Sequence, residues 1–391
     1  MDDVYIVDAV RTPFGARGGS LAGLHPQELS TIPLEALQAR LGFDPTSVDD
    51  VILGCVSPTD EQGGNIARIA PLVAGWGEDV PGVQLNRMCG SGQQAINFAS
   101  STVAAGQADL IVAGGIEHMT RVPMGSDTPA PDELMGDDIV VERYFDHVEE
   151  MTTQGEGAER IAEEYGFSRT DVDELAAESQ RRWGAANEAG HFDDQLVPVD
   201  TTYDGHDITL ERDEHPRPET TVETLGELPL VFREEGNGVH HAGNSSGIVD
   251  GASAVVIANE EQVERNGWEP MAVIRDHVVV GVDPVTMLKG PIPATKQLLD
   301  RTDLDIDDID RFEVNEAFAS VVLAWLEETG ADWDRTNVHG GAIAHGHPLG
   351  ATGSALLTKL AYELDRIEGR YGVSTMCIGF GQGIATLIER V

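Results

Sequence analysis

The 391-residue sequence predicts an α/β protein made of a duplicated strand–helix unit with paired central sheets. Short runs rich in β-branched residues alternate with helical patterns over the first 120 residues, which favours parallel strands covered by helices. A strand, a Gly-rich turn and a helix begin at residue 83, and the same order recurs from residue 337. Such a repeat fits a duplicated unit better than a single dinucleotide-binding sheet.

The expected elements follow from local patterns. Strands are expected where short apolar runs are rich in Val and Ile, at residues 4–10, 50–56, 83–85, 110–115, 252–258, 272–282 and 371–378. Helices are expected where apolar residues recur at helical spacing, at 26–41, 93–105, 171–189, 317–328 and from 354. Ser168-Arg-Thr-Asp precedes the third of these helices and is typical of a helix cap.

The middle of the chain differs in composition. From about residue 118 to 249, Pro-rich and acidic pieces surround the helix at 171–189. We therefore predict an N-terminal half at 1–117, to which 250–270 returns, a loop insertion at 118–249, and a C-terminal half at 271–391.

The charge is strongly unbalanced, with 68 acidic residues against 25 basic ones and a formal net charge of −43. Such a field repels nucleic acid and anionic membranes, so neither is expected as a partner. No apolar run approaches the roughly 18 residues of a membrane helix, and the first residues lack the pattern of a secretion signal. We expect a cytoplasmic protein.

Three cysteines, Cys55, Cys89 and Cys377, are too few and too far apart for a disulfide framework. In a reducing compartment an isolated Cys is either a buried small hydrophobe or a reactive thiol. Cys89 lies in Asn86-Arg-Met-Cys-Gly-Ser-Gly, a Gly turn that opens a helix. Backbone N–H groups there lower a thiol pKa and bind an oxyanion, which favours a nucleophile over a packed thiol.

Three further residues lie at Gly-rich ends of expected elements. His347, in Gly346-His-Pro-Leu-Gly, can take a thiol proton near neutral pH. Cys377 precedes Ile378-Gly-Phe-Gly-Gln-Gly, where a thiol beside backbone N–H groups suits proton transfer. Asn315 precedes a helix and either caps it or faces the same cleft. Together with Cys89 these residues predict a shared site.

Two other interpretations are disfavoured. His339, His345 and His347 fall within nine positions, but their spacing does not match a zinc site and no CxxC accompanies them, so no metal is expected. The glycines after Cys377 resemble a dinucleotide turn. Only eight residues follow Gly383, too few for the helix and strand that such a turn requires.

Four blocks resemble the signature blocks of the thiolase family, in the family's order. They are Asn86-Arg-Met-Cys-Gly-Ser-Gly, Asn315-Glu-Ala-Phe-Ala, Gly340-Gly-Ala-Ile-Ala-His-Gly-His-Pro-Leu-Gly and Cys377-Ile-Gly-Phe-Gly-Gln-Gly. Further similarities extend over essentially the whole chain. The resemblance implies the thiolase fold, a duplicated α/β unit with two central mixed sheets in a layered α-β-α-β-α arrangement plus a loop insertion.

The resemblance also implies a Claisen reaction on a CoA thioester. Cys89 would carry the acyl group, His347 would handle its proton, and Cys377 would act as acid and base. His347 and a water held by Asn315 would form one oxyanion hole. The N–H groups of Cys89 and Gly379 would form the second.

For the substrate, the resemblance implies contacts of CoA or its acyl chain with Ser246, Arg217, Phe318 and Met151. CoA is then a substrate, and no permanently bound cofactor is expected. Members of the family are homodimers or homotetramers, and residues 127–138 lie where a tetramerisation loop occurs. Enzymes of fatty-acid β-oxidation are the expected protein partners.

Three residues depart from the family's pattern. Phe380 replaces a common Gly, His339 a usual Asn, and His345 a usual aliphatic residue. None of them removes a catalytic group. They alter the shape of the cleft or place an extra titrating group near His347.

The direction of the reaction is expected from weaker similarities. Glu117-His-Met-Thr and residues 60–68 resemble the bacterial branch that degrades fatty acids, which favours cleavage of 3-ketoacyl-CoA to acetyl-CoA and a shortened acyl-CoA. The alternatives are an acetoacetyl-CoA thiolase that condenses two acetyl-CoA, a ketoacyl synthase, and a non-catalytic thiolase-like subunit that binds CoA or partner enzymes. Synthases have a second His at Asn315 and lack Cys377, and a scaffold would not need all four catalytic positions.

Acidic residues are spread along the whole chain, and only three of the basic residues are Lys. This predicts a salt-loving source, in which counterions screen the self-repulsion of the surface. We expect the protein to unfold in dilute buffer and to recover in molar KCl, as followed by circular dichroism. Full stability without salt would contradict the hypothesis.

Overall fold

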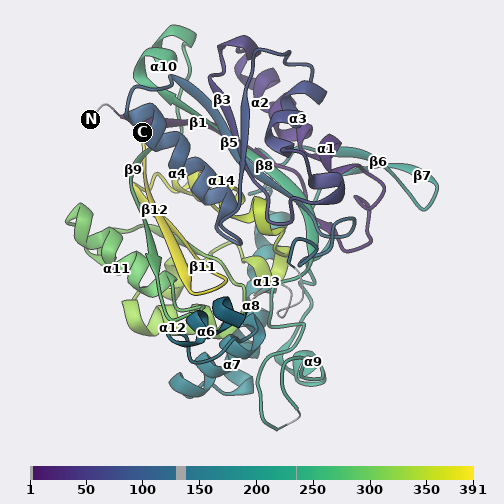
Figure 1. Cartoon of the computed structure of the whole chain (residues 1–391), viewed down its shortest axis with the longest axis vertical. Helices are drawn as coiled ribbons and strands as arrows, with labels where there is room; N and C mark the ends of the chain where they lie inside the picture. Colours follow the sequence, from purple (N-terminus) through teal and green to yellow (C-terminus); the bar gives the residue numbers. More distant parts are fainter. Residues whose placement is uncertain (1–2, 129–137, 235) are drawn as a thin grey trace.

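The computed structural model describes residues 3–128, 138–234 and 236–391. Within these residues, ten strands form one mixed sheet with the path β10-β11-β12-β9-β1-β8-β5-β3-β4, and β2 pairs with β8 (Figure 1). The strands of this sheet are β1 (Val4–Arg11), β2 (Gly15–Ala16), β3 (Asp50–Gly54), β4 (Gly82–Leu85), β5 (Leu110–His118), β8 (Val249–Asn259), β9 (Ala272–Gly281), β10 (Arg311–Val314), β11 (Tyr371–Ile378) and β12 (Gln382–Arg390).

The sheet consists of two halves that meet edge to edge. In the first half, β3 is parallel to β4 and β5, whereas β8 is antiparallel to β5 and β1. In the second, β10 is parallel to β11, and β12 is antiparallel to β11 and β9. The two predicted sheets are joined to each other at one edge. β1 and β9 pair at Tyr5–Val273 and Ile6–Ala272, which joins the halves because each edge supplies the other's missing hydrogen bonds.

The described helices are α1 (Pro26–Leu29), α2 (Thr31–Leu41), α3 (Ile66–Val73), α4 (Ser91–Ala104), α6 (Asp138–Phe145), α7 (Gln154–Tyr165), α8 (Arg169–Glu188), α9 (Val222–Gly226), α10 (Glu260–Asn266), α11 (Pro291–Thr302), α12 (Ala319–Thr329), α13 (Ala342–His345) and α14 (Leu349–Arg366). α4 and α14 pack on each other, and each also contacts strands of both halves (Figure 1). α2, α3 and α10 pack on the first half, and α11 on the second. The α/β class and the thiolase-like layering are thus as predicted.

Most expected elements are present, with shifted boundaries. The helix expected at 26–41 is divided into α1 and α2 at Ser30, and α14 begins five residues before Ser354. Ser168 caps α8 as predicted, because its side chain accepts from the N–H of Asp171 and the Asp171 carboxylate accepts in return. The hairpin of β6 (Val199–Tyr203) and β7 (His206–Leu210) was not predicted.

The insertion carries α7, α8 and α9, which lie together at one end of the molecule (Figure 1). α7 and α8 pack on α12, and α8 also packs on α13. Most of the expected tetramerisation loop at 127–138 lies outside the described residues. The division of the chain at 117, 249 and 271 stays a prediction.

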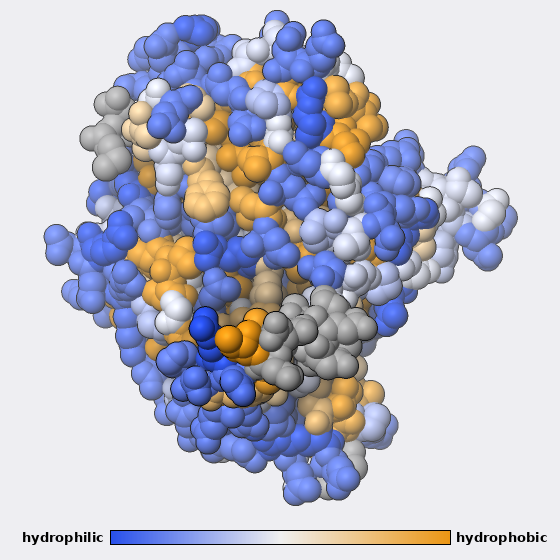
Figure 2. Space-filling model, viewed as in Figure 1, coloured by the Kyte–Doolittle hydropathy of each residue, from blue (hydrophilic) through white to orange (hydrophobic). Residues whose placement is uncertain are grey.

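The visible surface is mainly hydrophilic, with small apolar patches (Figure 2). This agrees with 68 acidic residues spread along the sequence. In the described part of the chain, no helix is both long and apolar enough to cross a membrane.

Glycines allow the N-terminal ends of α4 and α14 to touch the sheet and each other through their backbones. A Cβ on Gly92 would lie 2.7 Å from the carbonyl oxygen of Gly350. A Cβ on Gly350 would lie 2.7 Å from the carbonyl oxygen of Gly54, and one on Gly115 would overlap the oxygen of Gly350. No side chain fits at this crossing, which brings the turns before both helices together.

We predict that Gly115→Ala lowers the free energy of unfolding by at least about 2 kcal/mol, because the added methyl group must displace the backbone of α14. The matched control is Gly226→Ala, where a Cβ would meet no heavy atom within 4 Å. The control should stay within about 0.5 kcal/mol of the native protein. Urea unfolding of both variants in the same molar KCl is the measurement, and equal midpoints would show that the crossing tolerates a side chain.

Candidate active site

Cys89 lies in the turn between β4 and α4, and side chains of the same turn fix its shape. Met88 has a φ of 47°, in the left-handed region that a residue with a Cβ seldom adopts. The Asn86 side chain accepts from the N–H of Met88 at 2.7 Å, and the hydroxyl of Ser91 donates to the carbonyl of Met88 at 2.6 Å. The turn thus holds a strained backbone immediately before the thiol.

The Cys89 thiol is 4% exposed, and burial raises its pKa to about 11. Hydrogen bonds from the N–H of Gly379, from the N–H of Cys89 itself and from the Gln154 side chain act in the opposite direction. At neutral pH the group is therefore a thiol. The three donors are in place to stabilise negative charge that develops on or beside the sulfur.

Gly379 follows β11 and approaches the same sulfur. A Cβ at this position would lie 2.9 Å from Sδ of Met88 and 3.0 Å from Nε2 of Gln154. The next residue, Phe380, has a φ of 58°, and its side chain is 45% exposed. Left-handed residues therefore lie beside both backbone donors, one before Cys89 and one after Gly379.

His347 lies between α13 and α14, and its neighbours determine which ring nitrogen carries the proton. Its backbone N–H donates to the carbonyl of Gly247 at 2.9 Å. Nδ1 lies 2.6 Å from the hydroxyl of Thr352, which itself donates to the carbonyl of Pro348 at 2.9 Å. The hydroxyl is thus the acceptor for Nδ1–H, and Nε2 keeps a lone pair. Burial lowers the pKa of His347 to about 4, so the ring is neutral at pH 7.

Asn315 lies at the end of β10 and faces His347. Its Nδ2 is 3.3 Å from Nε2 of His347, and its backbone N–H donates to the carbonyl of Thr375 at 3.0 Å. The alternative role as a helix cap is wrong, because Phe318 occupies the cap position of α12. Oδ1 of Asn315 is buried and has no hydrogen-bond partner among the described residues. This acceptor is therefore available to a substrate or to a water.

Cys377, the penultimate residue of β11 and two residues before Gly379, is 1% exposed. Burial, and after it the charge of a Cys89 thiolate, raise the pKa of Cys377. Leu349 packs in the same apolar cluster as Cys89, together with Met376. The four predicted catalytic residues thus meet where β10 and β11 end and where α4 and α14 begin.

A cavity of about 270 Å³ opens onto Cys89. Its lining includes Gly379, Gln154 and Asp127, together with the apolar side chains of Val56, Met88, Met124, Met287, Leu349 and Phe380. His347, Asn315 and Cys377 do not line the cavity and are buried beside it. Phe380, which replaces a Gly common in the family, therefore forms part of the wall.

None of the four predicted CoA contacts lines this cavity. Ser246 precedes Gly247, whose carbonyl binds His347, and its N–H donates to the carbonyl of Ala317, next to Phe318. Phe318 is buried against Phe232, with ring centroids 5.6 Å apart. Arg217 is exposed, and Met151 is half-buried just before α7.

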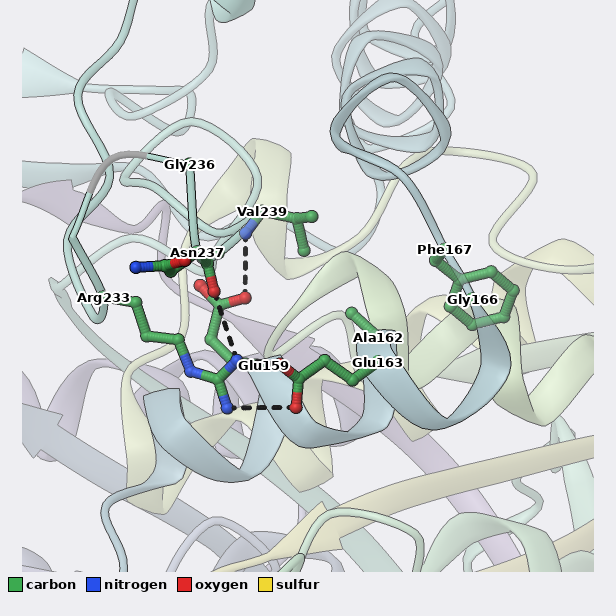
Figure 3. Close-up of a pocket in the computed structure, with 10 residues that line it drawn as sticks. Glu159, Ala162, Glu163, Gly166, Phe167, Arg233, Gly236, Asn237 and Val239 are labelled. Atoms are coloured by element: carbon green, nitrogen blue, oxygen red, sulfur yellow. Dashed lines mark hydrogen bonds and ion pairs between the residues drawn. The ribbon is translucent and has the colours of Figure 1, made fainter.

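A larger hollow of about 610 Å³ lies between α7 and the loop at 233–239 (Figure 3). Arg233 pairs with Glu163 at 2.5 Å and with Glu156 at 2.8 Å, and the buried Glu159 accepts from the N–H of Val239 at 2.8 Å. These contacts hold the loop against α7. The chain that leads into this loop places Phe232 against Phe318. The hollow is thus the space between α7 and a loop that ion pairs and hydrogen bonds hold in place.

His339 and His345 lie away from the cavity. Nδ1 of His345 bonds the carbonyl of Gly346 at 2.8 Å, and its ring packs edge-on against Phe14. His339 contacts His191 and Glu363 at the other end of α14. Over the described ranges, no group of three or more His, Cys, Asp or Glu side chains is arranged to hold a metal ion.

Sequence reasoning missed three contributors to the site. Gln154 carries no motif, and Thr352 is recognised only through its contact with His347. Glu117 was noted for family resemblance alone. Its buried carboxylate accepts from the N–H groups of Val56 and Gly350 at 2.8 and 2.9 Å, which holds the start of α14 against the loop after β3.

Comparisons with known proteins agree with this geometry. The family model described as thiolase, N-terminal domain, matches residues 4–261, and that described as thiolase, C-terminal domain, matches 268–390. The steroid 3-ketoacyl-CoA thiolase of Mycobacterium tuberculosis is 45% identical over 100% of this chain and 95% of its own length. The β-ketoadipyl-CoA thiolase of Pseudomonas aeruginosa is 43% identical over 100% of this chain and 99% of its own.

Among solved structures, human mitochondrial 3-ketoacyl-CoA thiolase in complex with CoA is similar, with a TM-score of 0.88 and 37% identity. The match covers 100% of this chain and 98% of that one. The two domain matches together span nearly the whole sequence, and the fold agrees with them. The chain therefore belongs to the thiolase family of acyltransferases.

Proposed function

We propose that this thiolase cleaves 3-ketoacyl-CoA into acetyl-CoA and a shortened acyl-CoA, with Cys89 as the nucleophile. The observation that carries the proposal is the buried thiol of Cys89, which has a second thiol, Cys377, near it. The N–H groups of Cys89 and Gly379 and the side chain of Gln154 donate hydrogen bonds to the Cys89 sulfur. Acyl transfer needs a nucleophile with donors at the developing oxyanion, and a Claisen cleavage also needs an acid for the departing carbanion.

The first step transfers the Cys89 proton to His347. The neutral imidazole has its Nδ1–H fixed on Thr352, so Nε2 is the nitrogen that accepts the proton. The sulfur then attacks the 3-keto carbon, and the N–H groups of Cys89 and Gly379 hold the oxyanion that forms. Because both groups start neutral, no buried ion pair exists before substrate binds.

In the second step the bond between C2 and C3 breaks, and its electrons move onto the thioester oxygen of the acetyl-CoA enolate. His347, now protonated on Nε2, donates to that oxygen, and a water held on Oδ1 of Asn315 is the second donor. Cys377 gives its proton to the C2 carbon. This role suits a thiol whose pKa is raised by burial, since it holds its proton until a stronger base forms.

In the last step the Cys377 thiolate takes the proton of an incoming CoA thiol. The CoA sulfur attacks the acyl group on Cys89, acyl-CoA leaves, and protonated His347 returns the proton to the Cys89 sulfur. CoA is thus a substrate in this proposal, and no permanently bound cofactor takes part.

The substrate class follows from the wall of the cavity. Met88, Met124, Met287 and Phe380 offer flexible and aromatic apolar surface beside the nucleophile, which suits an acyl chain longer than an acetyl group. The names of the two relatives, a steroid 3-ketoacyl-CoA thiolase and a β-ketoadipyl-CoA thiolase, support a cleaving thiolase. Ser246, Phe318, Met151 and Arg217 are the proposed contacts for CoA and the acyl chain.

The setting of the enzyme is proposed from the sequence. We place it in the cytoplasm of a salt-loving cell, as a homodimer or homotetramer that works with other enzymes of fatty-acid β-oxidation. The net charge of −43 supports the high-salt setting.

The proposed function is tested by the loss of acetoacetyl-CoA and longer 3-ketoacyl-CoA absorbance on addition of CoA in molar KCl. We expect cleavage over several chain lengths. Activity confined to four carbons would instead identify an acetoacetyl-CoA thiolase. A lack of activity, with Cys89 unmodified by iodoacetamide, would favour a non-catalytic subunit.

We predict that Cys377→Ser retains acylation of Cys89 by acyl-CoA but loses at least about 100-fold in turnover, because the hydroxyl is a poor proton acceptor from CoA. Mass spectrometry of the acyl-enzyme and the thiolysis rate are the two measurements. Cys55→Ser is the control, since Cys55 is a buried thiol outside the cavity lining. Unimpaired turnover in Cys377→Ser would contradict the assigned role.

Gln154 has a separate consequence. We predict that Gln154→Met slows alkylation of Cys89 by iodoacetamide about tenfold, because a hydrogen bond to the thiolate is lost and the thiol pKa rises further. Met124→Leu alters the same cavity without touching that bond and should alkylate at the native rate. An unchanged rate in Gln154→Met would mean that the backbone donors suffice.

A further inference from the structure

A second cavity, far from Cys89, collects positive charge in a chain that has little of it. It has a volume of about 350 Å³, and we call it the arginine pocket; its lining includes Arg181, Arg182, Arg311, Arg366, His191 and His339. Asp334 and Glu363 line it too, and Glu178 binds two of the arginines. Four guanidinium groups thus face three carboxylates, in a molecule where acidic residues exceed basic ones by 43.

The arginine pocket lies at the opposite end of the elements that build the active site. Arg311 begins β10, whereas Asn315 directly follows that strand. Arg366 ends α14, whereas His347 precedes it. The 18 residues of α14 span about 27 Å, so the pocket is not an extension of the cavity at Cys89.

The carboxylates do not occupy all the guanidinium N–H donors of the arginine pocket. Glu363 is bound by Nε of Arg311 at 2.9 Å and by Nε of Arg366 at 2.7 Å, and Glu178 is bound by Nε of Arg181 at 2.6 Å. Nη1 of Arg181, Nη1 of Arg366 and Nη2 of Arg311 have no acceptor among the residues that the structure describes. Each of these three arginines therefore keeps one Nη group whose N–H bonds can donate to a ligand.

The arginine side chains of the pocket differ in their exposed fraction. The less exposed ones are held in place by the protein, and the more exposed ones are accessible to a ligand. The Arg182 side chain is 8% exposed, and its Nη1 donates to the carbonyl of Thr336 at 2.7 Å. The Arg311 side chain is 22% exposed, whereas those of Arg366 and Arg181 are 42% and 64% exposed. Asp334 is 90% exposed and 3.7 Å from Arg182, so water screens its charge.

His339 supplies a neutral polar wall. Burial lowers its pKa to about 3, and its Nε2 lies 3.0 Å from Nδ1 of His191 and 3.3 Å from Glu363. His339 is thus neutral at pH 7, and the arginines, which stay protonated throughout the working pH range, supply the fixed positive charge of the pocket. His339 stands where the family usually has an Asn, so this wall is a feature of the present chain.

We infer that the arginine pocket binds an oxyanion of the phosphate or sulfate type, either free or as the phosphoryl group of a larger metabolite. Each free Nη group can donate a charge-assisted hydrogen bond to an oxygen of such an anion, and the three arginines together offer donors to several of its oxygens. The surrounding acidic surface repels anions at long range. In molar salt that field is screened within roughly 3 Å, so short contacts decide binding.

The test is isothermal titration calorimetry in constant molar KCl, with sulfate, inorganic phosphate and adenosine monophosphate as separate probes. We expect saturable binding of one site per chain. Binding of sulfate and phosphate identifies a free oxyanion site, and binding of the nucleotide alone identifies a phosphoryl group on a larger molecule. No saturable binding of any probe would overturn the inference and leave an ion-pair network.

The paired variants are Arg181→Gln with Arg366→Gln, and, as control, Arg17→Gln with Arg265→Gln. Both pairs remove two positive charges, but Arg17 and Arg265 do not line the pocket. We expect affinity to fall at least tenfold in the first pair only. Equal affinities would overturn the inference. Should the first pair unfold, Arg181→Gln alone decides, because that side chain is 64% exposed and can be replaced without disturbing the core.

Discussion

The backbone contact between the N-terminal ends of α4 and α14 is the constraint on which the active site depends. Gly92, Gly350 and Gly115 let the two helices and β5 approach to distances that no side chain allows. Cys89 lies just before α4, and His347 just before α14. The proposed nucleophile and its proposed base come from distant parts of the sequence, and this contact holds their turns together. Glu117 strengthens it by binding the N–H of Gly350.

Burial sets the protonation states of the site. It raises the pKa values of both thiols and lowers that of His347, so Cys89, Cys377 and His347 are all neutral at pH 7. A neutral resting state avoids the cost of burying a thiolate–imidazolium pair. In the proposed mechanism, the donors at Cys89 and Gly379 act where charge develops during the reaction. The same burial makes Cys377 a weak acid. This suits a group that, in the proposed mechanism, keeps its proton until the bond between C2 and C3 breaks.

The sequence was sufficient for the fold class and for the residues that meet at the site, because both depend on short patterns with a local cause. The Gly turn at Cys89 and the cap at Ser168 are examples. The β1–β9 joint could not be predicted, since two residue pairs at the edges of distant strands leave no periodic signal. Gln154 and Thr352 were missed for a similar reason, because their roles depend on contacts across the fold. The start of α14 was placed late, since its Gly-rich first turn resembles a loop.

The strong negative charge and a CoA substrate place opposite demands on the surface. CoA is an anion, so a chain with 25 basic residues must place its cations where they bind ligands instead of spreading them. Nearly all of these cations are Arg, whose planar group holds its charge and forms paired hydrogen bonds even where acidic neighbours compete. Arg217, a proposed CoA contact, and the four arginines of the second pocket would follow this rule. High salt then removes the long-range repulsion while leaving the short, directional contacts, so the acidic surface and the anion-binding sites can coexist in one molecule.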